Sequence, residues 1–298
     1  MKKITIAGSG VLGSQIAFQT AFFGYDVTVY DINDVILEKA RASFARYGDI
    51  YLNDVQATRI EVEAANAHLR LSSDLKVALE DADLLIEAIP ERVDIKRDFY
   101  QRVATLAPDK TIFATNTSTL LPSQFAAETG RPEKFLALHF ANEIWFRNTA
   151  EIMGHPGTSR ETFDAVVAFA KSIGMVALPL HKEQPGYITN SLIVPWVTAA
   201  LKLWAGDVAD YETIDKTWII ATKSNFAPFV FADIAGLNTA FNITSILATE
   251  MNDPQLRQAA KRLKEEYIDK GKLGIASGEG FYKYPDPAFE REDFLKYR

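Results

Sequence analysis

The chain has 298 residues, of which 48% are hydrophobic and 24% are charged. This composition is far from that of disordered, collagen-like or membrane-embedded chains, and the length predicts more than one compact core. A formal net charge of -7 argues against general electrostatic attraction to nucleic acid or anionic membranes. The absence of cysteine excludes disulfides, thiolate metal sites and thiol nucleophiles, and we expect no metal centre.

Short apolar runs alternate with longer helical patterns through the first 180 residues. This rhythm predicts an α/β fold with a mostly parallel sheet and crossover helices. The predicted strands are Ile4–Ala7, Val27–Tyr30, Leu69–Leu71, Leu84–Ala88, Thr111–Thr115 and Phe135–Leu138. A polar stretch over residues 33–66 is too long for an ordinary crossover, and its helical spacing predicts an inserted helix pair. Because the first strand starts within a few residues of Met1, we expect no signal peptide and a cytoplasmic protein.

The pattern changes after Leu138. Two further strand-like runs, Ala150–Met153 and Met175–Leu180, flank a helical segment over Ser159–Ile173. The segment from His181 to Gly186 then combines charge with Pro-Gly, which is typical of a domain boundary. We therefore predict a Rossmann dinucleotide-binding domain over residues 1–185 and an all-α domain over residues 186–298.

A glycine-rich turn directly follows the first predicted strand. It consists of Gly8, Ser9, Gly10, Val11, Leu12 and Gly13, and a predicted helix follows. Gly8 allows the tight turn, Gly10 lets the backbone approach a pyrophosphate, and Gly13 lets the helix pack on the strand. The helix N-terminus then offers free N–H groups and partial positive charge to phosphates. The alternative is a structural Rossmann-like turn that binds nothing or binds another nucleotide.

Asp31 stands at the end of the second predicted strand, where dinucleotide-binding folds place an acid about 20 residues beyond the glycines. A carboxylate there accepts hydrogen bonds from the adenosine ribose hydroxyls and repels a 2′-phosphate. Neither Ile32 nor Asn33 offers a cation that would attract that phosphate. The predicted cofactor is therefore NAD(H) rather than NADP(H).

His139 is the candidate catalytic base. It closes a predicted strand at its carboxyl end, where open α/β sheets carry their ligands, whereas the other three histidines lie in polar or turn segments. Glu151 begins the next strand-like run, so it faces the imidazole if the two runs pair. A carboxylate on one ring nitrogen fixes the tautomer and leaves the other nitrogen free to exchange a proton, as alcohol oxidation requires. A purely structural His and Glu is the competing interpretation.

Several polar residues at strand ends have two open interpretations. The run Asn116–Thr119 either caps a helix before Leu120 or presents Ser118 to substrate or cofactor. Glu91 and Lys96 are either a helix-start acid and a surface base, or part of the site.

The ordered motifs together resemble the 3-hydroxyacyl-CoA dehydrogenase family over nearly the whole chain. The matching stretches are residues 8–17 (GSGVLGSQIA), 86–91 (IEAIPE), 111–120 (TIFATNTSTL), 138–142 (LHFAN), 186–190 (GYITN), 232–237 (ADIAGL) and 278–284 (GEGFYKY). The resemblance implies a Rossmann domain plus a helical domain through which two chains dimerise, with the active site in the cleft between them.

The resemblance also implies roles for individual residues. His139 is implied to be the base in oxidation and the acid in reduction, with Glu151 as its orienting partner. Ser118 and Asn190 are implied to hydrogen-bond the reacting oxygen or its neighbours. Asn142 is implied to help hold the site, and Asn116, Ser118 and Asn142 are expected among the cofactor-binding residues. Glu91 and Lys96 are implied to line the nicotinamide end of the cofactor.

Two departures from the family pattern concern the substrate. The family's HFFNP reads His139-Phe140-Ala141-Asn142-Glu143 here, and the lysine-rich stretch that meets CoA phosphates is replaced by a stretch with Asp49 and Asp54. Acids near phosphates are unfavourable. Both features, with the 267–274 stretch YIDKGKLG, resemble the diketoreductase-like members, which reduce β,δ-diketo esters.

The expected function is NAD(H)-linked interconversion of 3-hydroxyacyl and 3-ketoacyl groups. The acyl carrier stays open between CoA, with Arg41, Arg46 or Arg59 replacing the lysines, and no carrier, with a free keto acid or ester as substrate. A hypothesis of another class is a non-catalytic NAD(H)-binding redox sensor.

Overall fold

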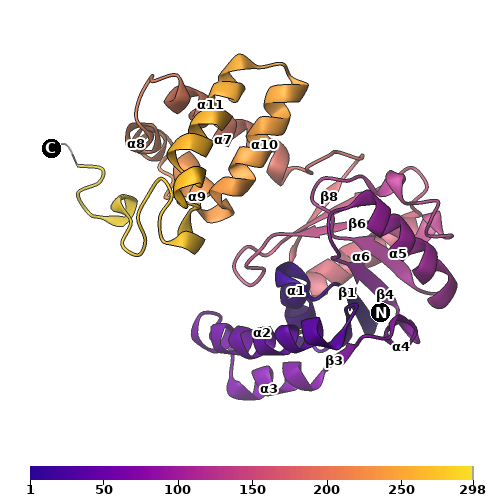
Figure 1. Ribbon diagram of the computed structural model, residues 1–298. Helices are drawn as coiled ribbons and strands as arrows, with labels where there is room; N and C mark the ends of the chain where they lie inside the picture. The colour runs from indigo at the N-terminus through magenta and orange to yellow at the C-terminus, as the bar shows by residue number, and fades with distance from the viewer. Residues whose placement is uncertain (297–298) are drawn as a thin grey trace. The chain divides into compact units, whose positions relative to one another are not determined.

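The computed structural model describes residues 1–296, which form two compact units divided between Ile188 and Thr189 (Figure 1). The first unit contains all eight strands of one sheet, in the order β3-β2-β1-β4-β5-β6-β7-β8. The strands are β1 Lys3–Ala7, β2 Asp26–Tyr30, β3 Leu69–Ser72, β4 Leu84–Glu87, β5 Ile112–Thr115, β6 Phe135–Phe140, β7 Thr149–Gly154 and β8 Val176–Leu180. Neighbours pair in parallel except β6 and β7, which are antiparallel. The strand order reverses between β1 and β4, where such sheets bind ligands.

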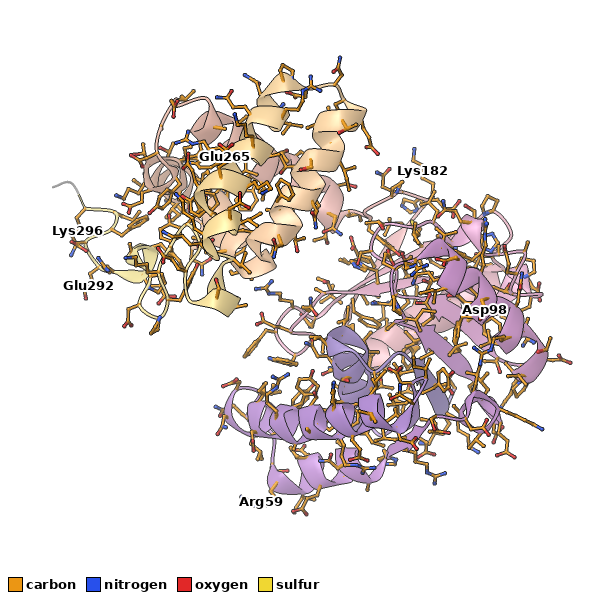
Figure 2. All side chains as sticks on the ribbon, in the orientation of Figure 1. Arg59, Asp98, Lys182, Glu265, Glu292 and Lys296 are labelled. Atoms are coloured by element: carbon orange, nitrogen blue, oxygen red, sulfur yellow. The ribbon has the colours of Figure 1, made fainter. Side chains whose placement is uncertain are left out.

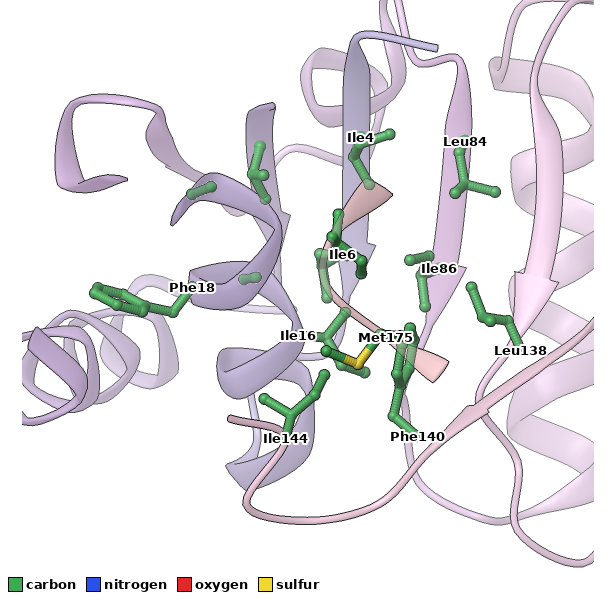
Figure 3. Packing of buried hydrophobic residues seen from close by; sticks show 14 of the residues in the cluster. Ile4, Ile6, Ile16, Phe18, Leu84, Ile86, Leu138, Phe140, Ile144 and Met175 are labelled. Atoms are coloured by element: carbon green, nitrogen blue, oxygen red, sulfur yellow. The ribbon is translucent and has the colours of Figure 1, made fainter. Parts of the chain in front are cut away.

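Helices cover both faces of the sheet. On one face lie α1 Val11–Phe22 and α6 Arg160–Ser172, together with α2 Asp34–Asn53 and α3 Arg59–Ala67, and on the other lie α4 Leu75–Leu79 and α5 Val93–Leu106. Figure 3 shows Ile4 and Ile6 of β1 and Ile86 of β4 packed among side chains of the first face. Because helices cover both faces, the sequences of the central strands are nearly continuous runs of apolar residues. The predicted α/β class is confirmed.

Helices α2 and α3 lie side by side next to α1 (Figure 1). The side chain of Asn33 caps α2, and Thr58 and Glu61 form a capping box at the start of α3. Phe18 of α1 packs against Tyr47 and Tyr51 of α2, with ring centroids 6.1 and 4.9 Å away. The connection between β2 and β3 is therefore anchored by an aromatic cluster.

The second unit is helical. Its helices are α7 Thr189–Ala205, α8 Tyr211–Thr222, α9 Pro228–Ala235, α10 Leu237–Glu250 and α11 Pro254–Glu266. Its apolar core is rich in aromatic rings, such as Trp204 against Phe281 at 5.3 Å. Charged side chains such as Glu265 here and Asp98 in the first unit point into solvent (Figure 2).

Two carboxylates are buried in the second unit and connect its C-terminal segment to its helices. Asp233 of α9 accepts hydrogen bonds from the backbone N–H groups of Phe281 and Tyr282, at 2.8 Å each. Asp215 of α8 accepts from the backbone N–H of Phe229 and from the Tyr282 hydroxyl. Burial raises the pKa of both carboxyl groups to about 6, although the hydrogen bonds oppose this shift.

Within residues 1–296, no single helix is long and apolar enough to cross a membrane. The pair α9 and α10, bent by 107°, meets that criterion by length and composition only.

Candidate active site

The glycine turn joins β1 to α1 and leaves space for a ligand at one position. Gly8 has a φ of +99°, and a Cβ there would lie 2.4 Å from the Ala88 carbonyl oxygen. A Cβ on Gly13 would lie 1.9 Å from the Gly8 carbonyl oxygen. A Cβ on Gly10, in contrast, would meet nothing within 4 Å. Gly8 and Gly13 are thus required by the close backbone packing, whereas Gly10 borders open space.

The N-terminus of α1 is available to an anion. Gly10 is the N-cap residue and supplies no side-chain hydrogen bond to the first turn, and that turn, which includes Val11 and Leu12, contains no acid. The first N–H groups of a helix have no intrahelical acceptor and carry partial positive charge. Together with the open space at Gly10, this arrangement fits a dinucleotide pyrophosphate.

Asp31 lies just beyond β2, and Ser9 holds its carboxylate. Oδ2 accepts hydrogen bonds from the Ser9 N–H at 2.7 Å and from the Ser9 hydroxyl at 2.8 Å, while Oδ1 accepts from the Ile32 N–H. The acid is therefore fixed beside the glycine turn, where a ribose would extend from the phosphates. Sequence reasoning did not assign any role to Ser9.

His139 and Glu151 are directly opposed partners in the antiparallel ladder of β6 and β7. The His139 Nδ1 lies 3.0 Å from Glu151 Oε2, and the Glu151 side chain is 2% exposed. The other carboxylate oxygen, Oε1, accepts a hydrogen bond from the Ile188 N–H at 2.9 Å. A carboxylate bound at Nδ1 leaves Nε2 as the atom that can exchange a proton with a ligand. The expected pairing of the two strands is observed.

Tyr187 completes the surroundings of the imidazole. Its ring stacks on His139 with centroids 4.5 Å apart and planes inclined by 16°, and its hydroxyl donates to the Thr117 carbonyl at 2.8 Å. Burial, and then the nearby carboxylates of Glu91 and Glu151, raise the pKa of this tyrosine well above its usual value. It is therefore a neutral phenol over the physiological range. Tyr187 was missed from the sequence, although its aromatic ring after Pro-Gly was a signal.

Glu91 organises the turn that contains Ser118. Its Oε1 accepts from the Ser118 N–H at 3.0 Å, from the Thr119 N–H at 3.1 Å and from the Thr117 hydroxyl. Burial alone would raise the pKa of Glu91, but these hydrogen bonds and the Lys96 ammonium lower it overall. The interpretation of residues 116–119 as a helix cap before Leu120 is wrong, because the next helical turn is the 3₁₀ turn Pro122–Gln124.

Lys96 is buried, which corrects its interpretation as a surface base. It is 1% exposed, and its Nζ lies 2.6 Å from Glu87 Oε1 and 3.3 Å from Glu91 Oε2. Glu87, the last residue of β4, is 0% exposed and also accepts from the Tyr100 and Thr115 hydroxyls at 2.9 Å each. Sequence reasoning missed Glu87, although an acid that closes an apolar strand was a usable signal.

The three asparagines of the predicted site have different surroundings. Asn116 is buried, and its Oδ1 accepts from the Phe140 N–H at 2.9 Å, so it ties the end of β5 to the end of β6. Asn142 is exposed in the loop that follows β6. Asn190 lies in the first turn of α7, in the second unit, and is partly exposed.

The loop between β6 and β7 is anchored to helices α1 and α2. The Gln15 side chain of α1 accepts from the Glu143 N–H at 2.8 Å, and the Trp145 ring lies 5.6 Å from Tyr47. Gln15 and Trp145 were also missed from the sequence, because their roles depend on contacts between distant segments.

The donor set fits a dinucleotide and offers no metal centre. Within residues 1–296, no three His, Asp or Glu side chains form a group that could hold a metal ion. The open helix N-terminus, the acid at Asp31 and the polar groups at the ends of β4, β5 and β6 all lie at the carboxyl edge of one sheet. In open α/β sheets this edge is the one that binds ligands, and its groups could hold the phosphates and the adenosine ribose of a dinucleotide.

Comparisons with known proteins agree with this geometry. The family model of the 3-hydroxyacyl-CoA dehydrogenase NAD binding domain matches residues 3–184, and that of the C-terminal domain matches residues 186–284. A probable 3-hydroxybutyryl-CoA dehydrogenase of Bacillus subtilis is 32% identical over 96% of this chain and 98% of its own.

Two solved structures are similar over nearly the whole chain. A diketoreductase, described as acting on dicarbonyl compounds, is 52% identical with a TM-score of 0.91, over 95% of this chain and 99% of its own. The (S)-3-hydroxybutyryl-CoA dehydrogenase of Ralstonia eutropha is 29% identical with a TM-score of 0.84, over 96% and 100% of the two chains.

Proposed function

Because this chain belongs to the 3-hydroxyacyl-CoA dehydrogenase family, we propose that it reduces keto groups of free β-keto and β,δ-diketo acids or esters. The enzyme is an NAD-dependent oxidoreductase that acts on CH–OH groups. The choice of a substrate without CoA is the proposal, and the CoA thioester is the second candidate.

One observation carries the proposal. The chain is 52% identical to a diketoreductase, but only 29% and 32% identical to the two 3-hydroxybutyryl-CoA dehydrogenases described above. At the higher identity, residues that shape a pocket are more often retained together with the fold. Fold likeness alone would not distinguish the two substrate classes, since the TM-scores of both structures are high.

The surface of α2 and α3 also favours a substrate without phosphates. The helix pair carries acids at Asp34, Glu38, Asp49, Asp54, Glu61 and Glu63 against bases at Lys39, Arg41, Arg46 and Arg59. This surface therefore has a small excess of negative charge, which disfavours the phosphates of CoA.

The second candidate, a CoA thioester, is favoured by the curated relatives, several of which are described as CoA dehydrogenases. Arg41, Arg46 and Arg59 are the bases that would then meet the CoA phosphates. Arg46 also lies over the Tyr47 ring at 5.4 Å, which leaves its guanidinium near the helix surface. Turnover of a free ester and of a CoA thioester distinguishes the two candidate substrates.

We assign the following roles to the residues of the site. Bound NADH supplies the hydride. In reduction His139 donates a proton from Nε2 to the oxygen of the reacting carbonyl, and Glu151 holds the imidazolium at Nδ1. The negative charge of Glu151, 2% exposed, stabilises that cation until the proton leaves.

Further roles follow from the position of each group. The Ser118 hydroxyl, on the turn that Glu91 holds, is proposed to donate to the same substrate oxygen, and Asn190 to bind the substrate beside it. Asn116 keeps the ends of β5 and β6 at a fixed spacing, and Asn142 is proposed to contact the cofactor. Substrate binding and dimerisation by the helical unit stay predictions, which variants at Asn190 and sedimentation of the full chain will test.

The test follows NADH absorbance with acetoacetyl-CoA and, in parallel, with a free β,δ-diketo ester, each with a matched NADPH control. We expect a higher kcat/KM for the ester with NADH. A much higher kcat/KM for the thioester would overturn the proposal in favour of the second candidate. Tight NADH binding without turnover of either compound would instead support a redox sensor.

A further inference from the structure

A cluster of three charged side chains, two of them buried, lies at the carboxyl end of β4. Lys96 is positioned between Glu87 and Glu91, at 2.6 and 3.3 Å. Glu87 and Lys96 are 0% and 1% exposed, and the Glu91 side chain is 38% exposed. Two carboxylates share one ammonium group, so the cluster keeps one uncompensated negative charge.

Hydrogen-bond donors surround the Glu87 carboxyl group. Besides Lys96, it accepts hydrogen bonds from the hydroxyls of Tyr100 and Thr115 and from the Ile89 N–H at 3.0 Å. All of these groups act as donors toward it, and a carboxylate is an acceptor at both oxygens.

A net negative charge beside two buried groups is costly, and packing alone does not explain it. One carboxylate would satisfy Lys96, and an ionised group in the protein interior loses its hydration. The hydrogen bonds around Glu87 reduce that cost without removing the charge. A ligand that is itself cationic would offset it.

The cluster lies where the nicotinamide end of a dinucleotide is expected. The Ala88 carbonyl packs so closely on Gly8 that no side chain fits at position 8. Because Ala88 directly follows Glu87, the phosphate turn contacts the segment that begins at the end of β4. With Asp31 on the β2 side for the adenosine ribose, the nicotinamide of a bound dinucleotide would extend toward β4 and β5, the next strands on the other side of β1. Glu91 also holds the Ser118 turn at the end of β5. The nicotinamide ring is neutral in NADH and positively charged in NAD⁺.

We infer that Glu87 is a positioning and electrostatic residue whose uncompensated charge strengthens NAD⁺ binding relative to NADH binding. In carbonyl reduction positive charge passes from the His139 imidazolium to the nicotinamide ring. Glu151 stabilises it at the first location, and the Glu87–Lys96–Glu91 cluster stabilises it at the second. This inference rests on NAD binding and on no particular substrate, so it stands or fails independently of the diketo assignment.

The test is a series of full-length variants that changes the charge of the cluster. Glu87→Gln removes the net negative charge of the cluster, and Lys96→Met doubles that charge. The double variant has the same net charge as the wild type, because one acid and one base are both replaced by neutral groups. The dissociation constant of NADH is measured by its fluorescence, and that of NAD⁺ by displacement of NADH. No turnover is involved in either measurement.

The expected result is an ordering of the ratio Kd(NAD⁺)/Kd(NADH). Relative to the wild type, we expect Glu87→Gln to raise the ratio about tenfold and Lys96→Met to lower it. A tenfold change is the effect of one unit charge roughly 12 Å away at an effective dielectric constant of about 20. The double variant returns to within about twofold of the wild type. If Glu87→Gln does not fold, the comparison of Lys96→Met with the double variant isolates the Glu87 charge.

Two outcomes would overturn the inference. One is a ratio that stays within about twofold of the wild type across all folded variants. The other is a shift of the same sign in Glu87→Gln and Lys96→Met, which would mean that each variant only disturbs local packing.

Discussion

The His139 imidazole lies face to face with the Tyr187 ring, at 4.5 Å between centroids and 16° between planes. The same tyrosine donates its hydroxyl to the Thr117 carbonyl, on the turn that precedes Ser118. One side chain therefore links the proposed proton donor to the turn that is proposed to hold the substrate oxygen. Its two contacts can be removed separately.

We expect Tyr187→Phe to preserve the stack and Tyr187→Leu to remove it. Phe leaves the Thr117 carbonyl without this donor, which should lower the free energy of unfolding by about 1–3 kcal/mol and leave kcat within about tenfold. Leu should lower kcat by about two- to tenfold more than Phe does, since aromatic pairs contribute about 0.5–1.5 kcal/mol and the ring also fixes the imidazole. Steady-state kinetics and urea unfolding distinguish the two effects. Equal kcat in both variants would exclude a positioning role for the ring.

Removal of the His139 imidazole should abolish proton transfer while cofactor binding persists. We expect His139→Ala to lower kcat by about 10²- to 10⁴-fold with an NADH dissociation constant close to that of the wild type. Glu151→Gln should lower kcat through the same proton transfer, so the double variant should be little worse than His139→Ala alone. Additive losses would show that the two side chains act independently.

Two glycines of the phosphate turn, Gly10 and Gly13, should respond differently to alanine. Gly10→Ala points a methyl group into open space, so the protein should stay folded while NADH binding weakens by about tenfold or more. Gly13→Ala is the matched control, because its Cβ would lie 1.9 Å from the Gly8 carbonyl oxygen and should lower stability. Thermal unfolding and NADH fluorescence measure both effects. Unchanged NADH affinity in Gly10→Ala would contradict the proposed phosphate position.

Asp31 should control the choice between NADH and NADPH. We expect Asp31→Ser to weaken NADH binding and to strengthen NADPH binding, because the repulsion of a 2′-phosphate is lost while a hydroxyl stays near the ribose. Ser9→Ala is the control, since it keeps the acid and removes only one of its donors. The measurement is the ratio of kcat/KM for the two cofactors. A ratio unchanged by Asp31→Ser would place the ribose elsewhere.

The buried carboxyl groups of the second unit predict a pH dependence of stability. Burial raises the folded-state pKa of Asp215 and Asp233 from 3.8 to about 6, so the folded protein binds protons more tightly than the unfolded chain. The contribution of these two groups to the free energy of unfolding is therefore most favourable below about pH 4. It declines as the pH rises through 6 and is constant above that. The decline is at most about 3 kcal/mol for each group.

Asp233→Asn should make this decline shallower between pH 4 and pH 6. Three of the four tryptophans, Trp196, Trp204 and Trp218, lie in α7 and α8, so their fluorescence in urea reports on the second unit. Because the amide also loses an acceptor, the informative quantity is the slope of the unfolding free energy with pH. An identical slope in the variant would exclude Asp233 as a titrating group.

Sequence patterns predicted what depends on local order. The strand runs, the glycine turn and the alignment of His139 with Glu151 follow from short-range periodicity, because paired strands place residues at regular intervals. Periodicity did not predict the burial of Lys96, because a lysine on a polar helix usually faces water and only the fold shows its contact with Glu87. Tyr187 and Gln15 were not predicted, because their partners lie far away in the chain.

The antiparallel pairing of β6 and β7 separates chemistry from selectivity. Because His139 and Glu151 are register partners in one ladder, their spacing depends on strand pairing and not on the length of the loop over residues 141–148. Insertions or substitutions in that loop can change the residues that surround the proposed proton-transfer pair, while that pair keeps its geometry. The hairpin is thus a module in which new substrate ranges can evolve without loss of the redox step.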